Sequence, residues 1–318
     1  MEEERTNLTT EPSSFEGKEA KKAFSRAGWG VTALLLIGSL VQIGASALVG
    51  AFAPELMERS WALWVVTFAP LYLIAFPIGI LILRRGRRFA GEGERMNAGL
   101  FLRSLLVCFF MMYAGNLIGT VINSLLQQLA GVPAGNPLMT YATDDSLILK
   151  ILVMVVLAPI LEELIFRKLL IDRLRGYGEK LAVLTSALIF GLFHGNLSQF
   201  FYAFGLGLVF GYVYLRTRQL RWSILLHMIV NFLGSVLAPA LMAAPDGTLT
   251  VIYGTALLAA SVAGLVLLIR NARRLRFDPA PEELPQGSRF STAFLNAGMI
   301  VFVIAGLVLM VLSALSVS

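Results

Sequence analysis

Histidine, cysteine and charged side chains are all scarce in this 318-residue chain. It has two histidines and one cysteine, and Asp, Glu, Lys and Arg together make up only 14% of it. A soluble domain carries about a quarter of charged residues, so this composition excludes an ordinary soluble enzyme. The single cysteine, Cys108, excludes an internal disulfide, and within an apolar run it gives no redox signal.

Long apolar runs take the place of the missing charge. Hydrophobic residues make up 57% of the chain, and the mean hydropathy is +0.76. A helix needs roughly 20 apolar residues to cross a bilayer. We therefore predict an all-α, polytopic membrane helix bundle with about 8–9 transmembrane helices and the active site in the bundle interior. The candidate spans are about 28–52, 61–83, 100–126, 147–167, 181–194, 197–215, 222–243, 249–269 and 292–316.

Basic residues gather in alternate loops between these runs. The segment 84–88 contains four arginines, whereas the loop at about 127–146 contains no basic residue. The positive-inside rule then places the N-terminus in the cytoplasm and the C-terminus outside. Topology also explains the net charge of +6 and the pI near 9.6, so we expect the lipid bilayer as a partner and no nucleic acid.

The chain is expected to divide into four segments. A cytoplasmic tail at 1–27 precedes N-terminal transmembrane helices at 28–146, and C-terminal transmembrane helices follow at 244–318. The segment between them, 147–243, is the predicted catalytic core because it carries polar residues inside its apolar runs. No internal repeat of fixed period is evident, although such repeats are common in transporters.

Ionisable side chains within the apolar runs are the strongest functional signal, since they are costly in hydrocarbon and usually face an internal site. The fourth run ends with Glu162, Glu163 and Arg167. Glu163 and Arg167 are four residues apart and should pair on one helical face. Glu162 points about 100° away around the helix, which leaves it as the freer acid, suited to activating water. Taken alone, the cluster also fits a solvated helix end.

Both histidines also lie in apolar runs. His194 ends the fifth run, and His227 lies four residues before Asn231 on the seventh. Hydrogen-bond donors of His227 and Asn231 aimed at one point would stabilise an oxyanion. Alone, each of these residues also fits an ordinary hydrogen bond between helices. Together, the three runs supply a base, an acid and oxyanion donors, which is the set that peptide hydrolysis requires.

Three features predict how these runs pack. Pro159 lies one turn before the glutamates and should kink the helix by freeing the carbonyl of Val155. Gly207 and Gly211 predict a close helix–helix approach. His194 lies about 20 Å along its run, so we expect that helix to begin in the cytoplasm, which would bring His194 to the depth of the glutamates.

Three motifs follow one another in this order: Glu-Glu-x-x-x-Arg, Phe-x-x-x-His and His-x-x-x-Asn. Their succession resembles the CPBP family of intramembrane endopeptidases, which includes the type II CAAX prenyl proteases and the Abi-like, bacteriocin-processing proteins. The resemblance covers about 147–235. The matching residues are Glu162, Glu163, Arg167, Phe190, His194, His227 and Asn231.

The resemblance implies a role for each matching residue. Glu162, with His194, would activate the attacking water, and His227 and Asn231 would hold the developing oxyanion. Three further residues would support the site: Glu163 and Arg167, which would brace it, and Phe190, which would pack around it. The implied substrate is a membrane-associated protein or peptide, and the implied location is a bacterial plasma membrane.

An older interpretation of the family makes its members metalloproteases. The zinc ligands here would be His194, His227 and Glu162, which is enough for a catalytic site with an open position. The chain has no His-Glu-x-x-His motif, and Asn231 is a poor zinc ligand. We therefore favour glutamate catalysis without a cofactor, with zinc as the alternative.

Two other functions compete with the protease. A transporter would use the same buried acids for proton coupling, and an immunity or scaffold protein would carry an inherited site without proteolysis. Because every motif position is filled, the active endopeptidase is the favoured interpretation.

Overall fold

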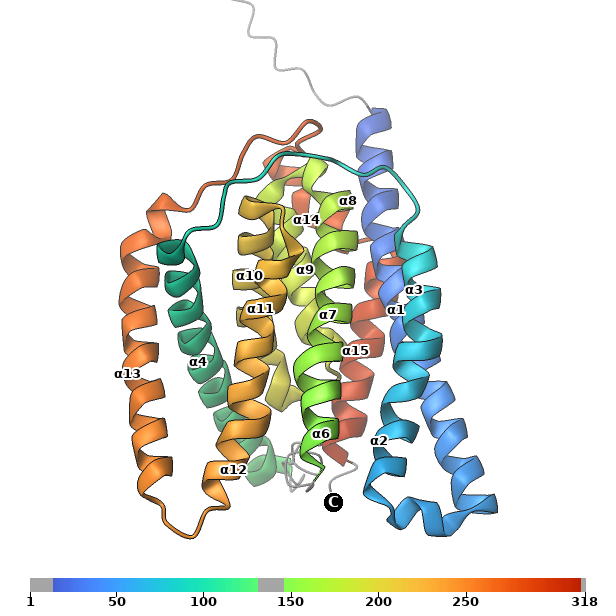
Figure 1. Cartoon of the computed structure of the whole chain (residues 1–318). Helices are drawn as coiled ribbons and strands as arrows, with labels where there is room; N and C mark the ends of the chain where they lie inside the picture. Colours follow the sequence, from blue (N-terminus) through green and yellow to red (C-terminus); the bar gives the residue numbers. More distant parts are fainter. Residues whose placement is uncertain (1–13, 131–145, 316–318) are drawn as a thin grey trace, which may run out of the picture.

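The computed structural model describes residues 14–130 and 146–315, and all regular secondary structure within these ranges is helical. The helices stand side by side in a single bundle (Figure 1). The start of the predicted tail and most of the loop at 127–146 lie outside the described residues. The prediction of an all-helical bundle is confirmed.

Seven helices of the described chain are long and apolar enough to cross a membrane. They coincide with seven of the predicted runs, and the multi-pass membrane architecture is confirmed. The seven helices are Gly17–Phe52, Ser60–Leu83, Ala98–Leu126, Leu197–Thr217, Leu220–Met242, Thr248–Arg274 and Ala297–Ala314.

The two remaining predicted runs are also helical but differ in character. The fifth run is α9 (Glu179–Phe193), whose 15 residues are fewer than a hydrocarbon core of about 30 Å requires. The fourth run is interrupted by charged side chains along one continuous helix. Both helices stand in the middle of the bundle (Figure 1), and Glu163, Arg167 and Ser186 on them are buried. The continuous helix comprises α6 (Leu147–Leu149), η3 (Lys150–Leu157), α7 (Ala158–Glu163), η4 (Leu164–Ile171) and α8 (Asp172–Leu174).

Other helices flank this centre on two sides. On one side α1 packs along α15 and against η2, and on the other α4 packs between α10 and α13. The bounds are α1 (Ser14–Phe52), α2 (Ser60–Ala69), η2 (Pro70–Ala75), α3 (Phe76–Leu83), α4 (Ala98–Ala130), α10 (Leu197–Thr217), α11 (Leu220–Asn231), η6 (Phe232–Leu237), α12 (Ala238–Met242), α13 (Thr248–Asn271), α14 (Arg289–Phe294) and α15 (Ala297–Leu315).

Glycines allow these helices to touch backbone to backbone. A Cβ on Gly207 would lie 2.9 Å from Ala187 Cα, and one on Gly211 would lie 3.1 Å from a methyl carbon of Val183, so α10 lies directly on α9. The predicted close approach at this glycine pair is confirmed. The same device joins α1 to α15, because a Cβ on Gly28 would lie 2.2 Å from the Gly298 carbonyl carbon.

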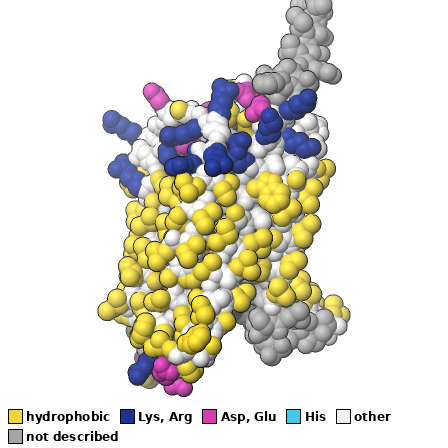
Figure 2. Space-filling view, turned by 90° about the vertical axis from the view of Figure 1, so that its right-hand side faces the viewer, with side chains coloured by type: hydrophobic (Ala, Val, Ile, Leu, Met, Phe, Trp, Pro, Cys, Tyr) yellow, Lys and Arg dark blue, Asp and Glu magenta, His cyan; other side chains and the backbone are white. Residues whose placement is uncertain are grey.

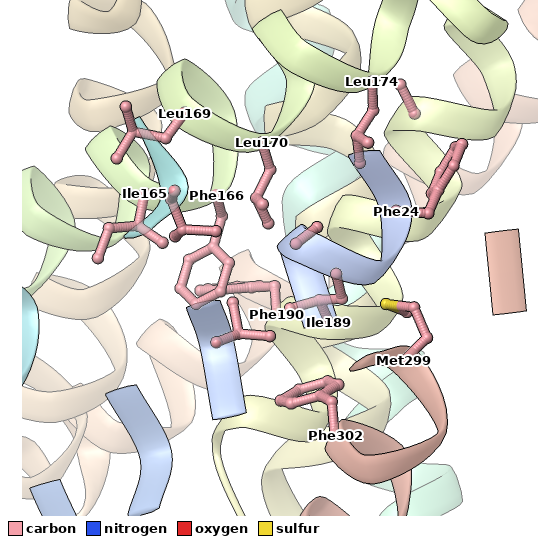
Figure 3. Packing of buried hydrophobic residues seen from close by; sticks show 14 of the residues in the cluster. Phe24, Ile165, Phe166, Leu169, Leu170, Leu174, Ile189, Phe190, Met299 and Phe302 are labelled. Carbon is pink, nitrogen blue, oxygen red and sulfur yellow. The ribbon is translucent and has the colours of Figure 1, made fainter. Parts of the chain in front are cut away.

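The largest hydrophobic cluster connects the centre to the α1–α15 side. Phe166 and Phe190 from the centre pack with Phe24 of α1 and Phe302 of α15, and all four are buried (Figure 3). Helix α1 begins at Ser14, well before the predicted span, because its first turns also bury apolar side chains. This cluster fixes the orientation of the helices that carry the candidate site.

Lysine and arginine side chains crowd one end of the bundle (Figure 2). Two segments without regular structure, 84–97 and 275–285, cross this charged end. Arg216 of α10 holds both, through ion pairs with Glu94 and with Asp278. The segments therefore cover the helix ends on the side where the basic residues lie.

Asp172 anchors the charged end from within. Its carboxylate is fully buried and accepts hydrogen bonds from Tyr214 Oη at 2.8 Å, from Arg88 Nε at 3.0 Å and from Arg218. Lys168 Nζ lies 3.5 Å away on the same helix. These donors come from three different parts of the chain, so Asp172 joins them at a single point.

Candidate active site

Pro159 shapes the helix that carries the two glutamates. In η3 the turns are π-helical, and the Ala158 N–H bonds to the Val153 carbonyl five residues back. The next donor in that pattern would be Pro159, which has no N–H, so the Met154 carbonyl is left free. Asn231 Nδ2 donates to that carbonyl at 2.8 Å. The prediction of a freed carbonyl was therefore one residue off, because it assumed α-helical rather than π-helical turns.

Glu163 is fixed from two helices. Its Oε2 lies 3.0 Å from Arg167 Nε, and its Oε1 lies 3.1 Å from His227 Nδ1 on α11. Its side chain is fully buried. The predicted pairing of Glu163 with Arg167 is confirmed, and the contact with His227 adds a second link.

Arg167 is held by aromatic faces as well as by Glu163. Its guanidinium carbon lies 4.6 Å from the centre of the Phe190 ring and 5.6 Å from that of Phe210. Among the described residues, none of its nitrogens has a hydrogen bond of good geometry, so the ion pair and the two cation–π contacts carry its charge. Phe210 was missed in the sequence because it belongs to no polar motif. Its position one residue before Gly211, where α10 approaches α9, was the available signal.

Glu162 has a looser environment than its neighbour. Its side chain is 16% exposed where that of Glu163 is 0% exposed. Among the described residues, its carboxylate has one close polar side-chain neighbour, His227, whose Nε2 lies 3.8 Å from Oε2, beyond normal hydrogen-bond length. Glu162 therefore keeps oxygen lone pairs available for another partner.

Phe190 brings the two histidines into one cluster. Its ring meets the His194 ring edge-on at 4.9 Å between centroids and the His227 ring edge-on at 5.8 Å. A series of contacts thus runs from Glu162 through His227 and Phe190 to His194. The structure brings all the motif residues of α7, α9 and α11 together, with Asn231 one turn beyond His227.

Hydrogen bonds set the orientation of each imidazole. His194 Nδ1 lies 2.8 Å from the Phe190 carbonyl oxygen, which can only accept, so Nδ1 carries the proton and Nε2 keeps its lone pair. The His227 ring stacks on Phe210 at 5.0 Å and directs Nδ1 to Glu163 and Nε2 to Glu162. The two histidines are therefore held in different ways.

Further polar groups surround the cluster. Tyr72 of η2 and Tyr202 of α10 both lie within electrostatic range of Glu162, although no motif pointed to them. His194 also lines a groove of about 800 Å³ between α1, α2 and α15. The inner face of α1 contributes Ser39 and Gln42 to this groove.

The alternative zinc ligands, His194, His227 and Glu162, come from the C-terminal end of α9, from α11 and from α7. Within residues 14–130 and 146–315, no group of three or more His, Cys, Asp or Glu side chains is placed to hold a metal ion. Nδ1 of His194 is bonded to the Phe190 carbonyl and Nδ1 of His227 is directed at Glu163, which leaves Nε2 of each ring as the nitrogen that would face a metal. The choice between glutamate and zinc catalysis therefore stays a prediction.

The central segment is similar to known membrane peptidases. Residues 144–233 match the family model described as type II CAAX prenyl endopeptidase Rce1-like. The putative membrane peptidase YdiL of Bacillus subtilis (strain 168) is 27% identical over 207 residues, covering 63% of this chain and 80% of that protein. The membrane-embedded CAAX protease MroQ of Staphylococcus aureus (strain USA300) is 32% identical over 83 residues, covering 24% of this chain and 34% of that protein.

No solved structure matches the chain. The family match spans the glutamate pair, both histidines and Asn231, and it supports a membrane peptidase function. The resemblance seen in the sequence is confirmed over residues 144–233, which are similar to the Rce1-like type II CAAX prenyl endopeptidases.

Proposed function

We propose that the chain is an intramembrane endopeptidase that hydrolyses a peptide bond in a membrane-associated protein or peptide. The observation that carries the proposal is the contrast within the glutamate pair. Glu163 is locked between Arg167 and His227, whereas Glu162 is partly exposed beside the same imidazole. One carboxylate maintains the site and the other is left to react.

Glu162 acts as the general base on the attacking water. A carboxylate with free lone pairs accepts a proton from water, and positioned acid–base groups contribute about 10²–10⁴-fold to rates. His194 assists it, because its Nε2 lone pair accepts a hydrogen bond while Nδ1 is tied to Phe190. The proton taken by Glu162 then passes to the leaving amine.

His227 and Asn231 stabilise the negative charge that develops on the carbonyl oxygen. The Asn231 amide has two N–H groups, and the Met154 carbonyl uses one of them. The other is available to an oxyanion. When His227 is protonated on both nitrogens, Nδ1 donates to Glu163 and Nε2 becomes a second donor.

Arg167 and Phe190 hold Glu163 and the two imidazoles in position. Arg167 holds Glu163 through the ion pair and lies over the Phe190 ring, which in turn contacts both imidazoles. This arrangement works without a metal ion, and glutamate catalysis is our preferred mechanism over the zinc alternative.

The charged end of the bundle faces the cytoplasm in our proposal, which puts the N-terminus inside and the C-terminus outside a bacterial plasma membrane. Water reaches His194 through the groove beside α1, because Ser39 and Gln42 give that groove polar walls at membrane depth. The substrate is drawn from the membrane that surrounds the bundle.

The test is to purify the full chain and its Glu162→Ala variant and to profile cleavage of a membrane-peptide library, with and without chelator. We expect cleavage by the wild type in both conditions and none by the variant. Equal activity of the two proteins would exclude proteolysis by this site. Loss of cleavage with chelator, followed by its recovery with zinc, would contradict the metal-free mechanism and support the zinc alternative.

A further inference from the structure

A second site lies at the charged end of the bundle, away from the glutamate pair. A cavity of about 320 Å³ opens where α1, the end of α3 and α8 meet. Four arginines line it, and we call it the arginine pocket. They come from three separate parts of the chain and are Arg26, Arg85, Arg87 and Arg173.

Positive charge dominates the arginine pocket because its acids are already engaged. Two glutamates line it, but Glu282 pairs with Arg87, and Glu19 pairs with Lys22 at 2.8 Å. Within the described chain, the other three arginines have no carboxylate within ion-pair distance. The pocket therefore presents several cations to whatever occupies it.

Arg173 is held in place by backbone carbonyls. Its Nε donates to the Arg85 carbonyl at 3.3 Å, Nη1 donates to the Leu169 carbonyl at 3.2 Å, and Nη2 donates to the Arg84 carbonyl. Burial lowers the pKa of this guanidinium, Asp172 raises it, and the nearby charges of Arg88 and Arg26 lower it further. A fixed guanidinium that is repelled by its neighbours is stabilised by an anion.

Gly86 makes room for Arg26 in the wall of the pocket. Its φ is +92°, which favours glycine, and a Cβ there would lie 2.2 Å from Arg26 Nη1. The Arg26 side chain therefore lies directly against the turn at 84–88. Glycine serves two purposes at this position, the turn itself and the placement of the guanidinium.

The floor of the arginine pocket is apolar. Leu83, Leu170 and Leu174 line it, and Leu170 and Leu174 belong to the cluster that packs on Phe24 (Figure 3). At this end of the bundle, basic side chains border on the apolar surface (Figure 2). A ligand with a charged head and an apolar body matches this combination.

We propose that the arginine pocket binds the phosphate group of an anionic phospholipid. Basic pockets between transmembrane helices are suited to anionic head groups. Arginine forks match phosphate oxygens, and the leucine floor accommodates the glycerol and the first methylenes of the chains. The bound lipid would join α1 to the segment 84–88 and to α8. The inference is independent of the proteolytic mechanism.

The experiment measures lipid retention by the full chain in mild detergent, by native mass spectrometry and by thermal unfolding. Phosphatidylglycerol, phosphatidylcholine and inorganic phosphate are compared. We expect phosphatidylglycerol to be retained and to raise the unfolding temperature, with no effect of phosphatidylcholine. An equal shift with inorganic phosphate would support a phosphate site and assign it to free phosphate. Equal retention of the two lipids, with no effect of phosphate, would overturn the proposal.

Variants locate the binding. Arg26→Ala should weaken phosphatidylglycerol retention about tenfold, as loss of one charge-assisted contact implies, and Arg26→Lys should restore part of it. Arg273→Ala is the matched control, because Arg273 is an exposed arginine outside the pocket. Equal weakening by Arg26→Ala and Arg273→Ala would mean non-specific attraction and would overturn the site.

Discussion

Two acids, Glu162 and Asp172, lie ten residues apart on the same helix, and they differ in how many hydrogen bonds their carboxylates accept. Asp172, at the charged end, accepts from Tyr214, Arg88 and Arg218. Glu162, in the middle of the bundle, has only a 3.8 Å approach to an imidazole. The contacts of Asp172 are typical of a structural residue that connects segments. Those of Glu162 are typical of a residue whose oxygens are available to a ligand.

The difference supports our proposal that Glu162, and not Asp172, takes part in catalysis. Buried polar groups are normally hydrogen-bonded, and exceptions in native proteins point to strain or function. Arg167 lacks well-aligned hydrogen bonds, and its guanidinium packs against aromatic rings. Glu162 keeps lone pairs that accept no hydrogen bond from the described residues. In the Asp172 cluster the carboxylate itself is satisfied, although Arg218 keeps two buried nitrogens without a hydrogen bond, so the two clusters differ in their acids rather than in their cations.

The largest effect should come from removing His194. His194→Gln keeps a polar side chain of similar size but removes the imidazole lone pair that assists Glu162, so we expect kcat to fall about 10²–10⁴-fold with little change in unfolding temperature. Steady-state cleavage with thermal unfolding of the same preparation checks this. An unchanged kcat would show that His194 does not assist Glu162 and would contradict its place in the proposed active site.

The next largest effect belongs to the structural cluster. Asp172→Ala leaves Arg88 and Arg218 beside a buried gap, and breaking a buried ion pair costs about 3–5 kcal/mol. Denaturant unfolding in detergent measures the loss, with the exposed Asp246→Ala as control. A variant that stays fully stable but loses cleavage would show that Asp172 belongs to the active site.

Asn231 is expected to contribute both to the stability of the bundle and to catalysis, so its replacement should affect both. Asn231→Ala should lower kcat about 10²-fold through loss of an oxyanion donor, and lower stability by about 1–3 kcal/mol because the Met154 carbonyl loses its donor. Asn123→Ala is the control, since Asn123 donates to Ser198 in the first turn of α10 and belongs to none of the three motifs. Loss of stability with unchanged kcat would make Asn231 purely structural.

The smallest effect should follow metal removal. We propose metal-free catalysis, and no group of three or more His, Cys, Asp or Glu side chains among the described residues is placed to hold a metal ion, so dialysis against chelator should change the cleavage rate by less than about twofold. The measurement is the initial rate before and after dialysis, with zinc added back. A large loss that zinc restores would contradict the metal-free mechanism.

Much of the fold could be predicted from composition and periodicity. Seven apolar runs became membrane-length helices, and the glycine pair on α10 identified its contact with α9. The packing of the fourth and fifth runs could not be predicted in this way, because the partners of their buried polar side chains lie on other helices, as in the contacts of Glu163 with His227 and of Ser186 with the Phe166 carbonyl. Whether α9 begins in the cytoplasm stays a prediction, since its short length fits that arrangement without proving it.

The candidate site was predicted in part. Spacing was enough for the Glu163–Arg167 pair, because that contact is made within one helix. The bonds from His227 to Glu163 and from Asn231 to the Met154 carbonyl join different helices and depend on π-helical turns, which no spacing rule indicates. Phe210 and Tyr72 were missed for the same reason, since their role arises only from packing.

In our proposal Glu162, and neither Glu163 nor Asp172, is the acid that reacts. The direct measurement is the cleavage rate per folded molecule of Glu162→Gln and Asp172→Asn, reconstituted side by side in the same vesicles. We expect Glu162→Gln to retain its fold and to lose about 10²–10⁴-fold in cleavage rate. We expect Asp172→Asn to be less stable, and its folded molecules to cleave at the wild-type rate. A Glu162→Gln protein that cleaves at the wild-type rate would contradict the proposal.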